Sequence, residues 1–222
     1  MLTPPPLGLY VHLPWCVRKC PYCDFNSHAL HGELPAGDYI EALLADLEND
    51  LPMVWGRTVS SIYIGGGTPS LFTANQIDTL LGRIRGMLQL TPDVEVTLEA
   101  NPGTIEHDSF TAYAQAGINR VSLGAQSFDD HSLQALGRIH ASDDVERSVE
   151  SLHAAGISNF NIDLMYGLPG QSLELALTDV ERAVACKPAH VSHYQLTLEP
   201  LSLIHISEPT RPNAPSRMPS AA

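Results

Sequence analysis

The chain has 222 residues, 44% of them hydrophobic, and a formal net charge of −13 from 12 basic and 25 acidic residues. This length is enough for one large domain with a buried core. The acidic balance argues against nucleic acid or an anionic membrane as the main partner, and no apolar run is long enough to span a membrane.

Segments with strand and helix patterns alternate along the chain. Strands are predicted at Gly8–Leu13, Ser60–Ile64, Val94–Leu98, Asn119–Ala125, Phe160–Leu164 and His190–Leu198. Helices are predicted at Asp38–Leu51, Gln76–Leu88, Glu106–Ala116, Asp143–Ala155 and Leu173–Cys186. Repeated strand–helix units predict an α/β fold with a parallel sheet and helices outside it, either a barrel or a doubly wound sheet.

The later strands place polar residues on one side and apolar residues on the other. The polar side holds Thr97, Glu99, Ser122, Gln126, Asn161, Asp163, His193, Gln195, Thr197 and Glu199. One interpretation is a half-exposed sheet whose polar side faces solvent. Because parallel sheets rarely leave a face open to water, we favour a wide, incomplete barrel with a polar interior that holds a polar ligand.

Three cysteines near the start, Cys16, Cys20 and Cys23, follow C-x₃-C-x₂-C spacing. No signal peptide is evident, so we expect a cytoplasmic protein in which clustered thiols bind metal before they form disulfides. Three thiolates are one fewer than a structural zinc requires, whereas a four-iron cluster with three Cys ligands keeps one iron free for a small molecule. A zinc site completed by His28 or His31 is the alternative, and the x₃ gap favours the cluster.

Other candidate residues follow the strands. The run Gly65–Pro69 lets backbone groups approach a ligand, although a tight turn explains it as well. Glu99, Gln126 and Asp163 fall at strand ends, on the edge that also carries the cysteine loop, which favours a site over three separate helix caps. Arg138 is expected either to clamp a carboxylate or to face solvent.

Six motifs occur in order and together carry a resemblance. They are Tyr10-Val-His-Leu-Pro-Trp-Cys-x₃-Cys-Pro-Tyr-Cys-Asp-Phe, Gly-Gly-Gly-Thr-Pro-Ser, Glu-Ala-Asn-Pro-Gly, Gly-Ala-Gln-Ser-Phe, Leu-Gly-Arg-Ile-His and Asp-Leu-Met-Tyr-Gly-Leu-Pro-Gly. Over roughly residues 7–200 the chain resembles the radical S-adenosylmethionine (radical SAM) proteins related to oxygen-independent coproporphyrinogen III oxidase. Within that family it is most similar to the heme chaperone branch.

The resemblance implies a partial (β/α)₆ radical SAM barrel without the family's C-terminal domain. It implies a 4Fe-4S cluster held by Cys16, Cys20 and Cys23, with S-adenosylmethionine on the open iron. The positions that match the family's S-adenosylmethionine-binding residues are Tyr10, Tyr22, Gly66, Gly67, Thr68, Glu99, Gln126, Arg138 and Asp163. In active members, cleavage of S-adenosylmethionine yields a radical that abstracts hydrogen.

Two departures from the family's sequence pattern refine the expected function. The oxidase branch has a further Cys shortly after the third cluster Cys, where this chain has Asp24-Phe25, as in the chaperone branch. A role in heme trafficking is therefore implied, with heme or a porphyrin as partner and with an unidentified heme acceptor and electron donor. The alternative is a coproporphyrinogen III dehydrogenase. Residues 1–200 are expected to form the core domain, and residues 201–222 a disordered or artefactual tail. The tail lacks the family's heme motif, so the heme site of the full-length family is expected to be absent here.

Overall fold

The computed structural model describes residues 4–103 and 108–197, and its centre is one parallel sheet. The six-stranded sheet has the order β1-β4-β5-β6-β7-β8, and every neighbouring pair is parallel. The strands are β1 (Leu7–Leu13), β4 (Thr58–Gly66), β5 (Gln89–Ala100), β6 (Arg120–Gln126), β7 (Phe160–Tyr166) and β8 (His190–Gln195). Since β1 and β8 are the two edges and do not pair with each other, the barrel is open, and the predicted α/β fold is confirmed.

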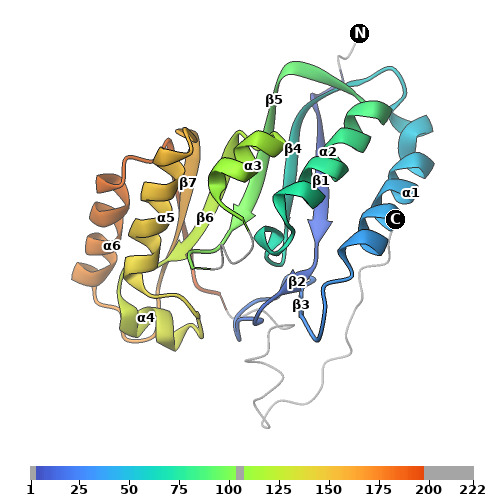
Figure 1. Cartoon of the computed structure of the whole chain (residues 1–222). Coiled ribbons are helices and arrows are strands. Elements are labelled where there is room, and N and C mark those ends of the chain that lie inside the picture. The colour runs from blue at the N-terminus through green and yellow to red at the C-terminus, as the bar shows by residue number, and fades with distance from the viewer. Residues whose placement is uncertain (1–3, 104–107, 198–222) are drawn as a thin grey trace.

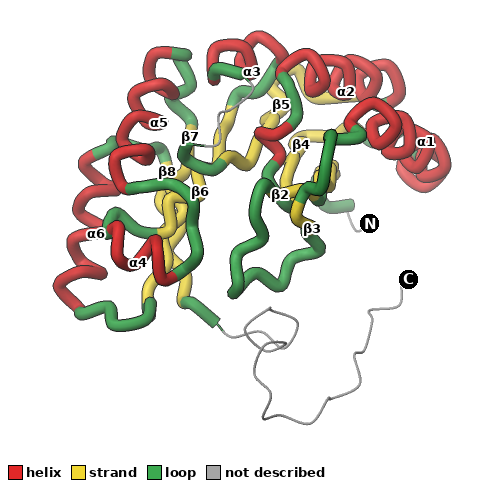
Figure 2. The backbone as a smooth tube through the Cα atoms, turned by 60° about the horizontal axis from the view of Figure 1, so that its bottom comes forward, coloured by secondary structure: helices red, strands yellow, loops and turns green. Residues whose placement is uncertain are grey.

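Helices line the outside of the curved sheet, as Figures 1 and 2 show. They are α1 (Ala36–Val54), α2 (Ala74–Met87), α3 (Phe110–Ala116), α4 (Asp130–Ala135), α5 (Ser142–Ala154) and α6 (Leu173–Ala185). Local sequence sets their ends. Thr73 and Gln76 form a capping box at the start of α2, and the left-handed Gly117 ends α3. The outward-facing strand residues are apolar and form one core with the buried helix faces.

Short elements around the cysteine loop were not predicted. β2 (Trp15–Cys16) pairs with β3 (His28–Ala29), which closes the loop between them. The 3₁₀ turn η1 (Pro69–Leu71) and helix α4 are also additions. Residues 106–107, at the start of the predicted helix Glu106–Ala116, lie outside the described residues. The predicted tail at 201–222 lies wholly outside them. Among the described residues, no helix is both long and apolar enough to cross a membrane.

The sheet's inward face is polar, although one strand was assigned incorrectly. Thr97, Ser122 and Asn161 are all buried, so the interpretation of a solvent-facing polar side is wrong. In β8, however, Ser192 pairs with Asp163 and Tyr194 with Met165, so Ser192 and Tyr194 face the interior. His193, predicted to face the interior, takes the opposite parity, and its ring lies against Tyr166. Gln195 and Thr197 line the cavity at the carboxyl end of the sheet, as the interpretation of a polar interior predicts. Glu199 lies outside the described residues.

Candidate functional site

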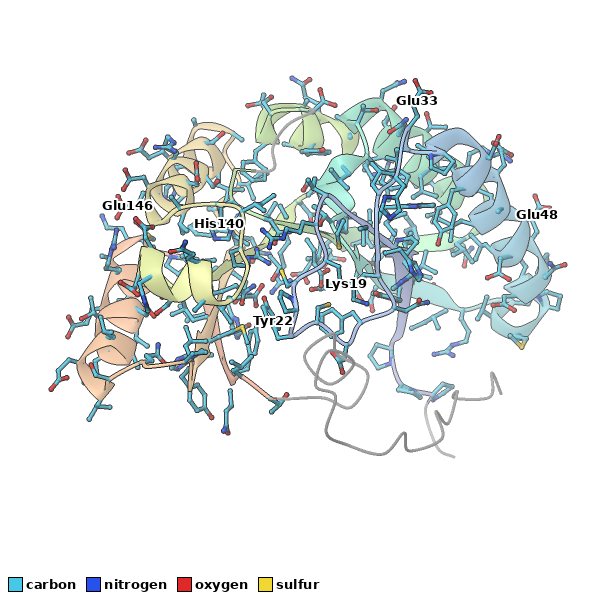
Figure 3. All side chains as sticks on the ribbon, turned by 90° about the horizontal axis from the view of Figure 1, so that it is seen from below. Lys19, Tyr22, Glu33, Glu48, His140 and Glu146 are labelled. Carbon is cyan, nitrogen blue, oxygen red and sulfur yellow. The ribbon has the colours of Figure 1, made fainter. Side chains whose placement is uncertain are left out.

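A cavity of about 530 Å³ lies at the carboxyl ends of the strands. Figure 3 shows the loop that carries Lys19 and Tyr22 lying across this end of the molecule. The cavity residues at the predicted positions are Cys16, Cys20, Tyr22, Cys23, Gly66, Gly67, Thr68, Glu99, Gln126, Arg138 and Asp163. Tyr10 is the exception, because it is not a lining residue and its hydroxyl instead contacts His12 Nδ1 at 2.9 Å. The volume is within the range of small-molecule sites.

Two side chains other than the cysteines hold the cysteine loop (residues 16–29) in place. Lys19 Nζ donates to the carbonyl oxygens of Phe25 at 3.0 Å and Ser27 at 2.9 Å. His12 Nε2 lies 2.7 Å from the carbonyl oxygen of Asn26. Three successive carbonyls are therefore bonded to side chains, which fixes the end of the loop. Neither Lys19 nor His12 was predicted, because their partners are backbone atoms that a residue pattern does not identify.

The three thiols of the loop line one cavity and are free of disulfides. Burial raises the pKa of the Cys16 thiol, and the hydroxyls of Thr68 and Ser27 oppose that shift. In the described part of the chain, no three His, Cys, Asp or Glu side chains are placed to hold a single metal ion. Neither His28 nor His31, the proposed fourth zinc ligands, lines the cavity. A soft, three-thiol donor set beside open volume fits an iron–sulfur cluster that keeps one iron open.

The glycine run joins the cysteine loop to the sheet. The Gly67 amide donates to the Leu13 carbonyl at 2.8 Å, and the Thr68 amide donates to the Trp15 carbonyl at 2.7 Å. Gly66 has φ of 122°, a conformation that favours glycine, and its amide donates to Glu99 Oε2 at 3.1 Å. The run is therefore more than a turn, since it places backbone donors at the cavity wall.

Glu99 is held by two donors at the end of β5. Tyr63 Oη donates to Glu99 Oε1 at 2.8 Å, and the Gly66 amide bonds the other oxygen. Burial raises the pKa of Glu99, while these two hydrogen bonds counteract the shift. Tyr63 was missed, although it has the parity of the polar side in the strand that precedes the glycine run.

Asp163 is oriented by a buried polar network. Ser122 Oγ donates to Asp163 Oδ2 at 2.8 Å, and Asn161 Nδ2 donates to Asp163 Oδ1 at 2.8 Å. Asn161 Oδ1 in turn accepts from Ser192 Oγ at 3.1 Å and lies 2.7 Å from His190 Nδ1. Both carboxylate oxygens are thus engaged before any ligand arrives, which holds the group in one orientation.

Gln126 ends β6 with φ of 69°, which is unusual for a residue other than glycine. A register shift between Leu123 and Gln126 accompanies this conformation. Tyr194 Oη donates to Gln126 Oε1 at 2.6 Å, so the amide group is oriented across the cavity. Tyr194 was not predicted because the parity of β8 was assigned incorrectly.

The guanidinium of Arg138 points into the site, so the solvent-facing alternative is wrong. Its Nη2 donates to Asn101 Oδ1 at 2.6 Å and to the Gly124 carbonyl at 2.9 Å. Its Nη1 lies 3.6 Å from Cys20 Sγ. The side chain therefore connects the long loop after β6 to the cysteine loop.

His140, which is buried near Arg138, is expected to make the stability of the fold sensitive to acid. Burial lowers the pKa of His140 to about 4, and the charge of Arg138 adds to this shift. Between pH 6.5 and about 4 the unfolded chain then binds more protons than the folded chain, so stability falls as the pH falls. We expect His140 to account for a loss of roughly 3 kcal/mol in the free energy of unfolding over this window.

Denaturant unfolding of the parent and of His140→Asn at pH 7 and pH 4.5 measures this contribution. The asparagine variant should lose less stability than the parent between the two pH values. Equal losses of stability in both proteins would contradict the assignment to His140, because the two chains share all their other titratable groups.

Comparisons with known proteins agree with the fold and with the motifs. The model of the radical SAM superfamily matches residues 10–183. The chain is 52% identical over 213 residues to the heme chaperone HemW of Escherichia coli K12, an alignment that covers 96% of this chain and 56% of that protein. It is 49% identical to the heme chaperone HemW of Haemophilus influenzae Rd, with 94% of this chain and 56% of that protein covered. The chain thus spans about half the length of these curated relatives.

Among solved structures, the chain is similar to the coproporphyrinogen III oxidase HemN from Escherichia coli, a radical SAM enzyme. The TM-score is 0.82 at 30% sequence identity, and the alignment covers 90% of this chain and 46% of that chain. This similarity confirms the predicted partial barrel and its relation to the oxidase.

Proposed function

Since the chain belongs to the radical SAM superfamily, we propose that it binds a 4Fe-4S cluster and S-adenosylmethionine in the cavity at the sheet's carboxyl edge. We propose further that this core acts in heme trafficking, as its relatives' name, heme chaperone, suggests. One observation carries the proposal: the cysteine loop, the glycine run and the polar strand ends all line one cavity.

Cys16, Cys20 and Cys23 are the proposed cluster ligands. When bound and reduced, the cluster supplies an electron that can cleave the sulfonium of S-adenosylmethionine. The rest of the loop orients the thiols, because Lys19 bonds the carbonyls that follow Cys23. Those bonds reduce the conformational entropy that the loop would lose on binding.

The proposed S-adenosylmethionine site is the remainder of the cavity. Tyr22, Gly66, Gly67, Thr68, Glu99, Gln126, Arg138 and Asp163 line it. Its carboxylates can accept hydrogen bonds from amino and hydroxyl groups, and the glycine backbone allows close approach. Tyr10 remains a proposed contributor through its position on β1, although its side chain contacts His12.

The heme role is proposed over coproporphyrinogen oxidation because of the residues that follow Cys23. Asp24 and Phe25 line the cavity in the place of the oxidase's additional Cys. An aromatic ring therefore replaces a thiol at this position, and Phe25 is 63% exposed. The curated relatives with 52% and 49% identity are both named heme chaperones.

Anaerobic reconstitution with iron and sulfide, followed by electron paramagnetic resonance after reduction, tests the cofactor proposal. We expect a reduced-cluster signal that changes when S-adenosylmethionine is added. A protein that takes up zinc but shows no cluster signal would contradict the proposal and support the zinc alternative.

A further assay separates the heme role from the oxidase alternative. Coproporphyrinogen III, added to the reconstituted chain with S-adenosylmethionine and reductant, should stay unchanged. Decarboxylated product would favour the oxidase alternative.

A further inference from the structure

We propose that Arg138 raises the reduction potential of the cluster by donating a charged hydrogen bond to the sulfur of Cys20. The inference rests on the proposed cluster site and goes beyond it, because it assigns Arg138 a role that does not require S-adenosylmethionine. Arg138 is a positioning residue in this account, since it acts through a ligand of the cluster.

The geometry gives Arg138 a fixed place beside the thiol. Its Nη1 lies 3.6 Å from Cys20 Sγ, a distance compatible with an N–H···S hydrogen bond. Its Nη2 is bonded to Asn101 Oδ1 and to the Gly124 carbonyl, and these two acceptors hold the planar guanidinium from the other side. The contact to sulfur is therefore built into the fold.

The positive charge of Arg138 has no carboxylate partner among the described residues, whose ion pairs involve other arginines. The Nε atom is buried and, in the described part of the chain, lacks a hydrogen-bond partner. Arginine stays protonated in proteins, so an uncompensated charge faces the cysteine loop. A buried charge of this kind is stabilised when an anionic group is placed next to it.

A cluster with three thiolate ligands provides that anionic group. Reduction adds one electron and makes the cluster more negative, so the adjacent positive charge stabilises the reduced form more than the oxidised form. Hydrogen bonds to cluster sulfurs shift reduction potentials in the same way. Removal of the guanidinium should therefore make the cluster harder to reduce.

The experiment is a reductive titration of the reconstituted protein, followed by electron paramagnetic resonance without S-adenosylmethionine. We compare the parent with Arg138→Met, which removes the positive charge, and with Arg138→Lys, which keeps the charge but lacks the planar guanidinium. The methionine variant should show at least a tenfold lower equilibrium constant for one-electron reduction, or about 59 mV in potential. The lysine variant should show a smaller decrease.

Arg147→Gln is the matched control. Arg147 lies on α5, its side chain is 65% exposed, and its partner is Asp144, so the variant removes the same net charge outside the cavity. Its cluster should keep the parent's potential. Iron and sulfide contents, measured for every variant, confirm equal loading.

Three results would overturn the inference without contradicting the proposed function. They are an unchanged reduction potential in Arg138→Met, a shift of the potential in Arg147→Gln equal to that in Arg138→Met, or loss of the cluster in both Arg138 variants. The last result would assign Arg138 to cluster assembly instead. If the parent itself assembles no cluster, the proposed function fails and this inference fails with it.

Discussion

Replacement of Cys20 by serine is expected to abolish cluster assembly while the fold is retained. Among the described residues three thiols line the cavity, so the variant leaves two ligands. A serine hydroxyl is a harder, poorly ionised donor that iron–sulfur clusters do not favour. Loss of an outer-shell partner already lowers metal affinity by about 10- to 100-fold, and loss of a ligand should exceed that. Iron and sulfide per chain after anaerobic reconstitution measure the effect.

Cys186→Ser provides the matched control for this substitution. Cys186 caps the end of α6, is half-buried against the core, and is not a cavity residue. The variant should assemble a full cluster, and thermal unfolding of both apo variants should remain close to that of the parent. A Cys20→Ser protein with full iron content would contradict the proposed ligand set. So would equal iron loss in Cys186→Ser.

Local patterns were sufficient to predict most of the fold. Each of the predicted strands and helices has a counterpart in the described residues, because apolar periodicity and glycine stops report directly on backbone geometry. The same reasoning predicted that Glu99, Gln126 and Asp163 share one edge, since parallel strands all end on the same side. The cavity that contains all three confirms this juxtaposition.

Errors arose where the answer depends on pairing between distant segments. In β8 His193 was assigned to the inward face, yet pairing of Asp163 with Ser192 gives that face to Ser192 and Tyr194. Gln195, at the end of the strand, does line the cavity. Alternation alone could not resolve this, because β8 carries polar residues at both parities.

The roles of Tyr63 and Arg138 were also beyond a linear pattern. Tyr63 becomes a site residue through its hydrogen bond to Glu99 on the neighbouring strand. Arg138 contacts Cys20 across 118 positions of sequence. A motif identifies such residues as candidates, whereas their partners depend on how the loops fold over the sheet.

Gly67→Ala is the second substitution with a large expected effect, because it separates the glycine run from the cysteine loop. A Cβ at this position would lie 2.5 Å from the Trp15 carbonyl oxygen and 2.7 Å from the Pro14 carbonyl carbon. These are backbone atoms that cannot rotate away, so β2 or the glycine run must shift. Overpacking typically costs about 1–3 kcal/mol, and we expect a loss of unfolding free energy at the upper end of this range.

The same shift should impair the site beyond the loss of stability. The amides of Gly67 and Thr68 donate to the carbonyls of Leu13 and Trp15, so displacement of the run also moves the residue before Cys16. Denaturant unfolding of the apo protein and cluster content after reconstitution measure the two effects separately. Gly82→Ala is the control, since Gly82 lies within α2 with open space around it and alanine there should add about 1 kcal/mol. A Gly67→Ala protein with the parent's stability and cluster content would contradict this account. It would show that the close packing of the glycine run against β2 does not position the cysteine loop.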